Sequence, residues 1–306
     1  MEMLIKKDYL IFEMAKAVAR DGRPFIRMVL SDEGKLINGI MFEATKLSFD
    51  PQKGDIVTIQ ALLQSYNNQP QLKIMEMEFV SRQGSLAFLP KSKNDPALMA
   101  EELKGLLLKH VTDEWLSAVV ERFYDDKEVY DSFLMMPAAK GMHHAYIHGL
   151  LEHTLGACRL GVDTAGLYPY INKSLLLTGA LLHDVGKVLE LDYSSAFEYT
   201  DEGRLLGHLM QGYTIVSGYI ESIPGFPVPL RQELLHLIAS HHGELEFGSP
   251  QVPKTAEALL LHFIDDLDAK LNAFSIVLEK DGVEPGGWSG YDRLLERQVF
   301  LPKRQS

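Results

Sequence analysis

The sequence predicts a multidomain α and β protein in which a small N-terminal β-barrel precedes an all-α helical bundle. Apolar residues alternate at short range up to about residue 80, which is typical of strands. From about residue 96 to about residue 280 they recur at three- and four-residue spacing, which is typical of helices. All 11 histidines lie between His110 and His262. We therefore expect one domain over residues 1–90 and another over 91–306, with the chemistry in the second.

The first domain is expected to hold about five strands, a number typical of a small closed barrel. The segment "YLIFEMAKAVAR" predicts an early strand, two more flank a turn at Ser31–Gly34, and another pair flanks Asn67–Pro70. This arrangement resembles an OB-fold, and the resemblance implies a domain that binds single-stranded nucleic acid. Three aromatic residues are candidates for stacking on bases: Phe25, Phe42 and Tyr66. The alternative is a barrel used only for packing or oligomerisation, with these aromatics in its core.

A linker over residues 85–95, "SLAFLPKSKND", separates the two domains, because its proline and polar residues interrupt regular structure. The apolar spacing after it predicts helices near 96–109, 112–124, 126–135, 143–161, 172–191, 205–222, 230–242 and 255–278. The tail from Glu284 onward is expected to be ordered only where its aromatic residues pack.

The composition favours a soluble protein of the cytoplasm. Apolar residues make up 46% of the chain and charged residues 24%, and no apolar run reaches the roughly 18 residues of a membrane-spanning helix. The N-terminus lacks the pattern of a signal peptide. Cys158 is the single cysteine, so the chain has no internal disulfide, which is typical of a reducing compartment.

The charge is divided unevenly along the chain. Residues 1–90 hold 11 basic and 11 acidic side chains, whereas 91–306 hold 19 and 31, which accounts for the net charge of −12. Such a chain offers no broad basic surface to nucleic acid duplexes. A polyanionic substrate in the second domain needs local positive charge, which bound metal ions would supply.

Several expected helices carry histidines or aspartates where their apolar pattern predicts a bundle core. An ionised carboxylate in an apolar interior is costly unless it is paired or binds a metal. Imidazole and carboxylate together suit Mn²⁺, Fe²⁺, Zn²⁺ or Ni²⁺, and helical bundles build metal sites from inward-facing residues of separate helices. The sequence therefore predicts a divalent metal site made from these segments: His153, His183–Asp184, His208, His241–His242 and Asp265–Asp268. Lone histidines such as His110, His236 and His262 are expected to be structural or exposed.

The order of these residues resembles the HD superfamily of metal-dependent phosphohydrolases. The resemblance implies four core ligands, His153, His183, Asp184 and Asp265. It implies further ligands, as in HD proteins with two metals, at His208, His241 and His242, and Asp184 would then bridge. The segment "IDDLDAK" leaves Asp266 and Asp268 open as alternatives to Asp265.

A likeness over nearly the whole chain is more specific. An OB-like barrel followed by "HHAYIHGLLEHT", "ALLHDVGK", "HHGELEFGSP" and "DAKLN" resembles the YhaM-type 3′→5′ exoribonucleases of bacteria. The resemblance implies hydrolysis of single-stranded RNA to nucleoside 5′-monophosphates, with DNA as an open alternative. It also implies two divalent ions per site, chosen from Mn, Fe, Ni, Zn or Mg, with manganese favoured. His148 departs from it, because the family more often has glycine there.

Two residues are assigned to catalysis. Asp184 would act at the metals. Lys187 follows His183 by one helical turn and is therefore assigned to the phosphate oxygens as a point charge. His143 and His144 join Lys187 as candidate substrate-binding residues, with capping or surface roles as the alternative. Gly186 is expected only to permit close packing.

Two other functions stay open. HD proteins also cleave cyclic dinucleotides, small nucleotides and phosphomonoesters. Gly248-Ser249-Pro250 lacks the tyrosine of the "GYP" that marks the enzymes for cyclic dinucleotides. The second alternative is a non-catalytic regulator that binds RNA or nucleotides and holds a metal for structure. The metal, the choice between RNA and DNA, and a possible homo-oligomer are not fixed by the sequence.

Overall fold

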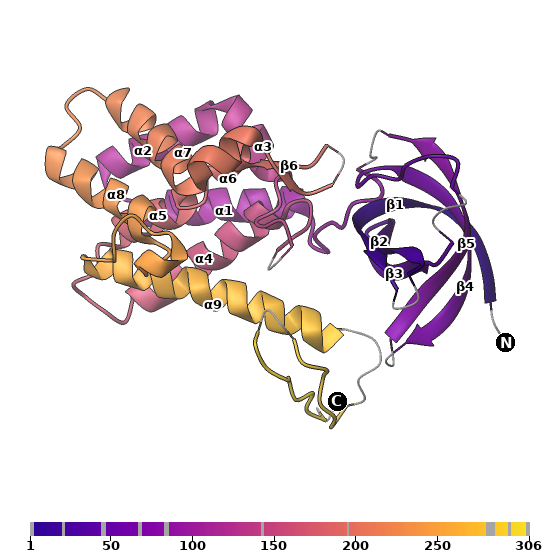
Figure 1. Cartoon of the computed structure of the whole chain (residues 1–306). Helices are drawn as coiled ribbons and strands as arrows, with labels where there is room; N and C mark the ends of the chain where they lie inside the picture. The colour runs from indigo at the N-terminus through magenta and orange to yellow at the C-terminus, as the bar shows by residue number, and fades with distance from the viewer. Residues whose placement is uncertain are drawn as a thin grey trace.

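The structure, a computed structural model, describes residues 3–19, 22–43, 47–66, 69–82, 86–141, 144–194, 196–279, 285–292 and 295–303. A barrel of strands and a larger helical body lie side by side (Figure 1). Both parts of the predicted architecture are therefore confirmed. Within the described residues, no helix combines the length and apolar character needed to cross a membrane.

The barrel is closed by five strands in the order β1-β2-β3-β5-β4. The strands are β1 (Met3–Val18), β2 (Pro24–Asp32), β3 (Lys35–Met41), β4 (Ile56–Tyr66) and β5 (Gln69–Ser81). Among the described strands of the barrel, β3 and β5 pair in parallel and the other neighbours are antiparallel. The β2–β3 turn is tight because Glu33 and Gly34 both have positive φ, 47° and 84°.

Alternation buries one face of each strand in the barrel. The core includes Ile11, Met28, Leu30, Ile59 and Leu72. Of the three aromatics expected to stack on bases, Phe25 is only 8% exposed and packs on Phe42, with ring centroids 6.1 Å apart, outside the barrel's core cluster, whereas Phe42 and Tyr66 are 49% and 61% exposed.

The body is built from helices around one large apolar core. They are α1 (Pro96–His110), α2 (Glu114–Asp125), α3 (Lys127–Met135), α4 (Gly149–Ala165), α5 (Lys173–Leu182), α6 (Lys187–Glu190), α7 (Asp201–Glu221), α8 (Val228–Ser240) and α9 (Ala256–Glu279). Side-chain caps begin several of them, with Asp95, Asp113 and Asn172 each accepting from backbone N–H groups of the first turn.

Two predicted helices were wrong in extent. The helix expected over 143–161 begins only at Gly149, because His148 has a left-handed φ of 69°. The helix expected over 172–191 ends at Leu182 and resumes at Lys187, with a four-residue turn between. A short hairpin of β6 (Leu191–Asp192) and β7 (Glu198–Tyr199), which the sequence did not predict, follows it.

This hairpin packs against the barrel and makes the contact between the barrel and the helical body. The rings of Phe12 and Phe197 meet edge to face at 5.5 Å. Lys53 Nζ lies 2.7 Å from Glu198 Oε1, and Lys140 Nζ of the body lies 2.5 Å from Glu198 Oε2. Leu89 is buried in the same contact. We propose that the domain boundary lies near residue 90, where the chain leaves this contact without helix or strand.

The C-terminal tail packs beneath the end of α9 (Figure 1). Leu295, Val299 and Leu301 are buried against Ala273 and Val277 of that helix. Trp288 and Phe300 pair in a short bridge with ring centroids 5.3 Å apart.

Candidate metal centre

Four of the predicted ligands converge from α4, the α5–α6 turn and α9. His153 Nε2 lies 3.1 Å from His183 Nε2 and 3.2 Å from Asp265 Oδ1. Asp184 Oδ2 lies 3.4 Å from His183 Nε2. Ligand atoms about 2.1 Å from one cation lie about 3.0–3.4 Å apart in octahedral or tetrahedral geometry, so these atoms suit a single ion.

A second group lies on the other side of Asp184. His208 Nε2 and His241 Nε2 are 3.5 Å and 3.6 Å from Asp184 Oδ1. His242 Nε2 is 3.2 Å from His208 Nε2. The two oxygens of Asp184 thus face different histidine groups, which is the arrangement a bridging carboxylate needs.

All five histidines are held by the ring nitrogen that faces away from the cluster. The Nδ1 atoms of His153 and His208 lie 2.7 Å and 3.0 Å from Asp268 and Glu190 carboxylate oxygens. Those of His183, His241 and His242 lie 2.9 Å, 2.9 Å and 3.0 Å from the carbonyl oxygens of Ala180, Ile238 and Phe247. Because a carboxylate or carbonyl oxygen can only accept, we assign a proton to Nδ1, so that Nε2 is the atom that faces the cluster and can bind a metal.

Buried polar atoms without partners show that this donor set fits a metal. Among the described residues, Asp184 Oδ1 and His241 Nε2 are buried and accept no hydrogen bond. Leaving such atoms unpaired costs about 1–3 kcal/mol each. A divalent cation between them would satisfy both, and mixed imidazole and carboxylate ligands suit Mn²⁺, Fe²⁺, Ni²⁺ or Zn²⁺.

Burial and neighbouring charge set the protonation of the cluster. Burial raises the pKa of Asp184, but the Lys187 ammonium and His183 outweigh it and hold that pKa well below its ordinary value. Burial lowers the pKa of His241 to about 4. At neutral pH the carboxylate is therefore anionic and this imidazole neutral, which are the forms that bind metals.

Lys187 is buried and belongs to the centre rather than to the solvent. Its Nζ lies 2.5 Å from Asp184 Oδ2. The sequence expected it to share a face with His183 on a continuous helix. Instead it begins α6 and reaches back to Asp184 across the turn.

Glycines allow the segments to approach closely. A Cβ on Gly186 would lie 2.0 Å from the carbonyl oxygen of His208, so the α5–α6 turn packs directly on α7. That helix is itself kinked at Gly207, where φ is 69°. Gly186 therefore has the packing role expected from the sequence.

The three aspartates of "IDDLDAK" have separate surroundings. Asp265 is in the cluster, and Asp268 Oδ2 accepts from His153 Nδ1 instead of facing its Nε2. Asp266 lies 2.7 Å from Lys270 Nζ in an exposed ion pair. The geometry thus favours Asp265 as the ligand.

Other histidines lie outside the ligand cluster. His144 is 4% exposed, and its Nε2 is 2.9 Å from Asp268 Oδ2. His148 Nδ1 lies 2.6 Å from the Leu134 carbonyl oxygen. His262 Nδ1 lies 2.9 Å from the carbonyl oxygen of His241, so it holds the backbone at the end of α8, next to the cluster, and is not itself part of the cluster. His143 lies outside the described residues.

Glu190, which holds His208, was missed in the sequence. Its pKa is raised by burial but lowered overall by hydrogen bonding to His208. The available signal was an acid within the apolar string "HDVGKVLE" that also carries His183.

Comparison with known proteins agrees with this geometry. The HD domain model matches residues 150–270, which include every predicted ligand named above. The chain is 32% identical over 306 residues to the 3′-5′ exoribonuclease YhaM of Bacillus subtilis (strain 168), covering 95% of this chain and 92% of that one. It is 34% identical to the protein of that name from Listeria innocua, covering 92% and 89%. No solved structure matches the chain. The chain belongs to the YhaM 3′-5′ exoribonuclease family and contains its HD domain.

Proposed function

We propose that this protein is a metal-dependent 3′-5′ exoribonuclease that hydrolyses single-stranded RNA to nucleoside 5′-monophosphates. The observation that carries the proposal is Asp184, whose two oxygens lie 3.4 Å and 3.5 Å from the Nε2 atoms of His183 and His208. A pair of divalent cations, of which manganese is favoured, would supply Lewis-acid activation of water and phosphodiester.

The residues of the centre divide into two ligand groups. His153, His183, Asp265 and Asp184 Oδ2 would hold one ion, and His208, His241, His242 and Asp184 Oδ1 the other. In the reaction, water adds to phosphorus, the bond from phosphorus to O3′ breaks, and O3′ takes up a proton. We assign Lys187 to neutralise charge on the phosphate, because its ammonium is buried beside Asp184.

The barrel is proposed to bind the RNA strand. A groove of about 640 Å³ on the side of β2, β3 and β5 is lined by Arg23, Phe42, Lys73 and Met75, with other residues. Exposed Phe42 offers a face for a base, and the basic side chains suit a phosphate backbone. Strands 2 and 3 form the nucleic acid face of OB-folds.

We further propose that the enzyme acts in the cytoplasm and forms a homo-oligomer. The buried free thiol of Cys158 suits a reducing compartment. Leu259, Phe263, Leu267 and Leu271 are exposed at four-residue spacing along α9 and offer an apolar face for self-association. Sedimentation at several protein concentrations tests the second point.

The function is tested with a 5′-labelled single-stranded RNA and Mn²⁺, with and without chelator. We expect stepwise shortening from the 3′ end, release of nucleoside 5′-monophosphates, and loss of both on chelation. Asp184→Asn should abolish shortening, whereas Asp266→Asn, the same change on an exposed aspartate of α9, should leave it intact. A wild-type protein that binds Mn²⁺ but leaves the RNA whole, or cleaves only a cyclic dinucleotide, would overturn the proposal.

A further inference from the structure

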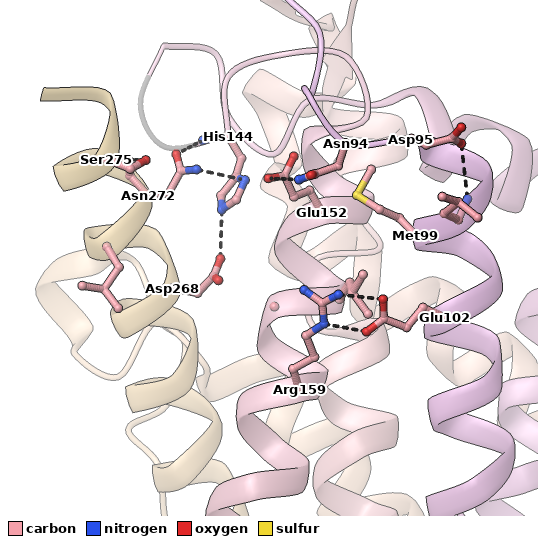
Figure 2. A pocket seen from close by; sticks show the side chains of 14 residues that line it. Asn94, Asp95, Met99, Glu102, His144, Glu152, Arg159, Asp268, Asn272 and Ser275 are labelled. Atoms are coloured by element: carbon pink, nitrogen blue, oxygen red, sulfur yellow. Dashed lines mark hydrogen bonds and ion pairs between the residues drawn. The ribbon is translucent and has the colours of Figure 1, made fainter. Parts of the chain in front are cut away.

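A chain of hydrogen bonds leads away from His153 on the side opposite its Nε2. Asp268 Oδ2 lies 2.7 Å from His153 Nδ1 and 2.9 Å from His144 Nε2. His144 Nδ1 lies 2.8 Å from the Tyr146 hydroxyl, and Asn272 Nδ2 lies 3.2 Å from that hydroxyl. Figure 2 shows His144 between Asp268 and Asn272 of α9.

We propose that Asp268, His144, Tyr146 and Asn272 form a positioning chain that orients His153 and sets its affinity for a divalent cation. The inference deepens the proposed function and rests on it for the cation. It replaces the expected substrate role of His144, because this side chain is buried and both of its ring nitrogens are engaged.

The directions of the hydrogen bonds are mutually consistent along the chain. If His153 Nε2 is a ligand atom, its proton is on Nδ1 and points at Asp268. His144 Nε2–H can then donate to the same oxygen, so His144 Nδ1 accepts from Tyr146. Burial raises the pKa of Tyr146, so its hydroxyl keeps the proton for this bond. The hydroxyl oxygen in turn accepts from Asn272 Nδ2.

The backbone fixes His144 at some cost. Its φ is 48°, in the left-handed region that strains residues other than glycine. Asn272 Oδ1 accepts from its backbone N–H at 2.9 Å, and its carbonyl oxygen accepts from Ala138 N at 3.1 Å. A Cβ on Gly149 would lie 2.0 Å from that carbonyl oxygen, so only glycine allows this fold of the chain. Such strain is retained where a side chain must be placed accurately.

A cavity beside the positioning chain leaves room to test Asp268 by substitution. Asp268 and His144 line a cavity of about 460 Å³ between α1, α4 and α9. Gly156 lines the same cavity, and a Cβ there would lie 2.3 Å from Asp268 Oδ1. The carboxylate would have to move away from it. Gly156→Ala therefore displaces Asp268 without removing any hydrogen-bonding group.

The test is a Mn²⁺ titration of the full chain after chelator treatment, read by calorimetry. Removing a residue that supports a metal ligand typically weakens binding 10–100-fold. We expect Asp268→Asn and Gly156→Ala to weaken the binding of one Mn²⁺ equivalent by about 10–100-fold, and His144→Leu by about tenfold. His144→Gln, which retains an N–H for Asp268, should recover most of the loss, and Asp266→Asn should match the wild type.

Wild-type affinity in Asp268→Asn and His144→Leu would overturn the inference. So would equal losses in His144→Gln and His144→Leu, because the role would then be packing alone. If a thermal melt shows that Asp268→Asn does not fold, the comparison of His144→Gln with His144→Leu tests the inference on its own. RNA shortening by the wild type is measured separately, so a failed nuclease assay with intact Mn²⁺ binding would count against the proposed function and leave the positioning chain supported.

Discussion

Asp184 Oδ1 lies 3.5 Å from His208 Nε2 because the turn that carries Asp184 packs directly on the backbone of His208. The contact is made at Gly186, where an added Cβ would lie 2.0 Å from the His208 carbonyl oxygen and 2.5 Å from Gly212 N. Neither partner is a flexible side chain. The spacing of the two ligand groups therefore depends on a backbone-to-backbone approach.

Gly186→Ala should separate the α5–α6 turn from α7. Because overpacking costs about 1–3 kcal/mol, we expect a loss of that size in the free energy of unfolding, and weaker Mn²⁺ binding at His208. Gly218→Ala on the same α7 is the control, since among the described residues no atom beyond its chain neighbours and its own helix backbone lies within 4 Å of its added Cβ. It should stabilise the protein by about 0.5–1 kcal/mol. Denaturant melts of both variants measure the difference. A Gly186→Ala protein with the free energy of unfolding and the Mn²⁺ affinity of the wild type would contradict the close backbone approach at Gly186.

The periodicities predicted most of the fold but not the turn that holds His183 and Asp184. The string "LLHDVGKVLE" stays apolar on both sides of the break, because residues 181–188 are buried whether the chain is helical or not. The apolar spacing therefore predicted one unbroken helix across the turn. The hairpin after it has strands of two residues each, too short for any alternation to register.

The site could be predicted where an ionisable residue stands at a position that the apolar pattern assigns to the core. An ionisable residue in a core register, such as His153 or Asp184, needs a partner that the sequence can only supply elsewhere. The supporting contacts were less visible. Asp265 and Asp268 are one turn apart on α9, so the pattern alone could not say which binds and which supports. The carbonyl oxygens that hold His183, His241 and His242 carry no signal in residue type.

Divalent cations should stabilise the fold. Binding to the native state adds RT ln(1 + [L]/Kd), which is about 2.7 kcal/mol at a hundredfold excess over Kd. We expect Mn²⁺ to raise the melting temperature of the wild type and chelator to lower it again. Asp184→Asn should show little of this response, because it weakens both ligand groups. An equal rise in this variant would mean that Mn²⁺ binds elsewhere.

The contact between barrel and body should weaken in acid through Glu198. Burial raises the pKa of Glu198, but hydrogen bonds from Lys140 and Lys53 lower it overall. A lowered pKa means that the stabilisation is complete above the ordinary value of about 4.3 and is lost as pH falls through the folded value. The group is 31% exposed, so we expect only about 0.5–1 kcal/mol.

The matching measurement is the free energy of unfolding between about pH 3 and pH 7 for wild type and Glu198→Gln. The difference in free energy of unfolding between the two proteins should shrink as the pH falls below the ordinary pKa of glutamate. Glu279→Gln is the control, because the Lys93–Glu279 pair is 79% and 61% exposed and should contribute little. A gap that persists unchanged at the acid end would mean that Glu198 acts through packing.

His148 provides a test of backbone strain apart from the metals. Its φ of 69° is left-handed, and its ring is held by the Leu134 carbonyl oxygen at 2.6 Å. His148→Ala loses that bond and keeps the strain, whereas His148→Gly loses the bond and relieves the strain. Because the left-handed conformation costs residues other than glycine about 1–2 kcal/mol, we expect the glycine variant to be the more stable of the two by about that amount in denaturant melts. Equal stability would mean that the chain changes conformation at this position once the ring is removed. Mn²⁺ binding should be the same in both, because His148 contacts no ligand of the described cluster.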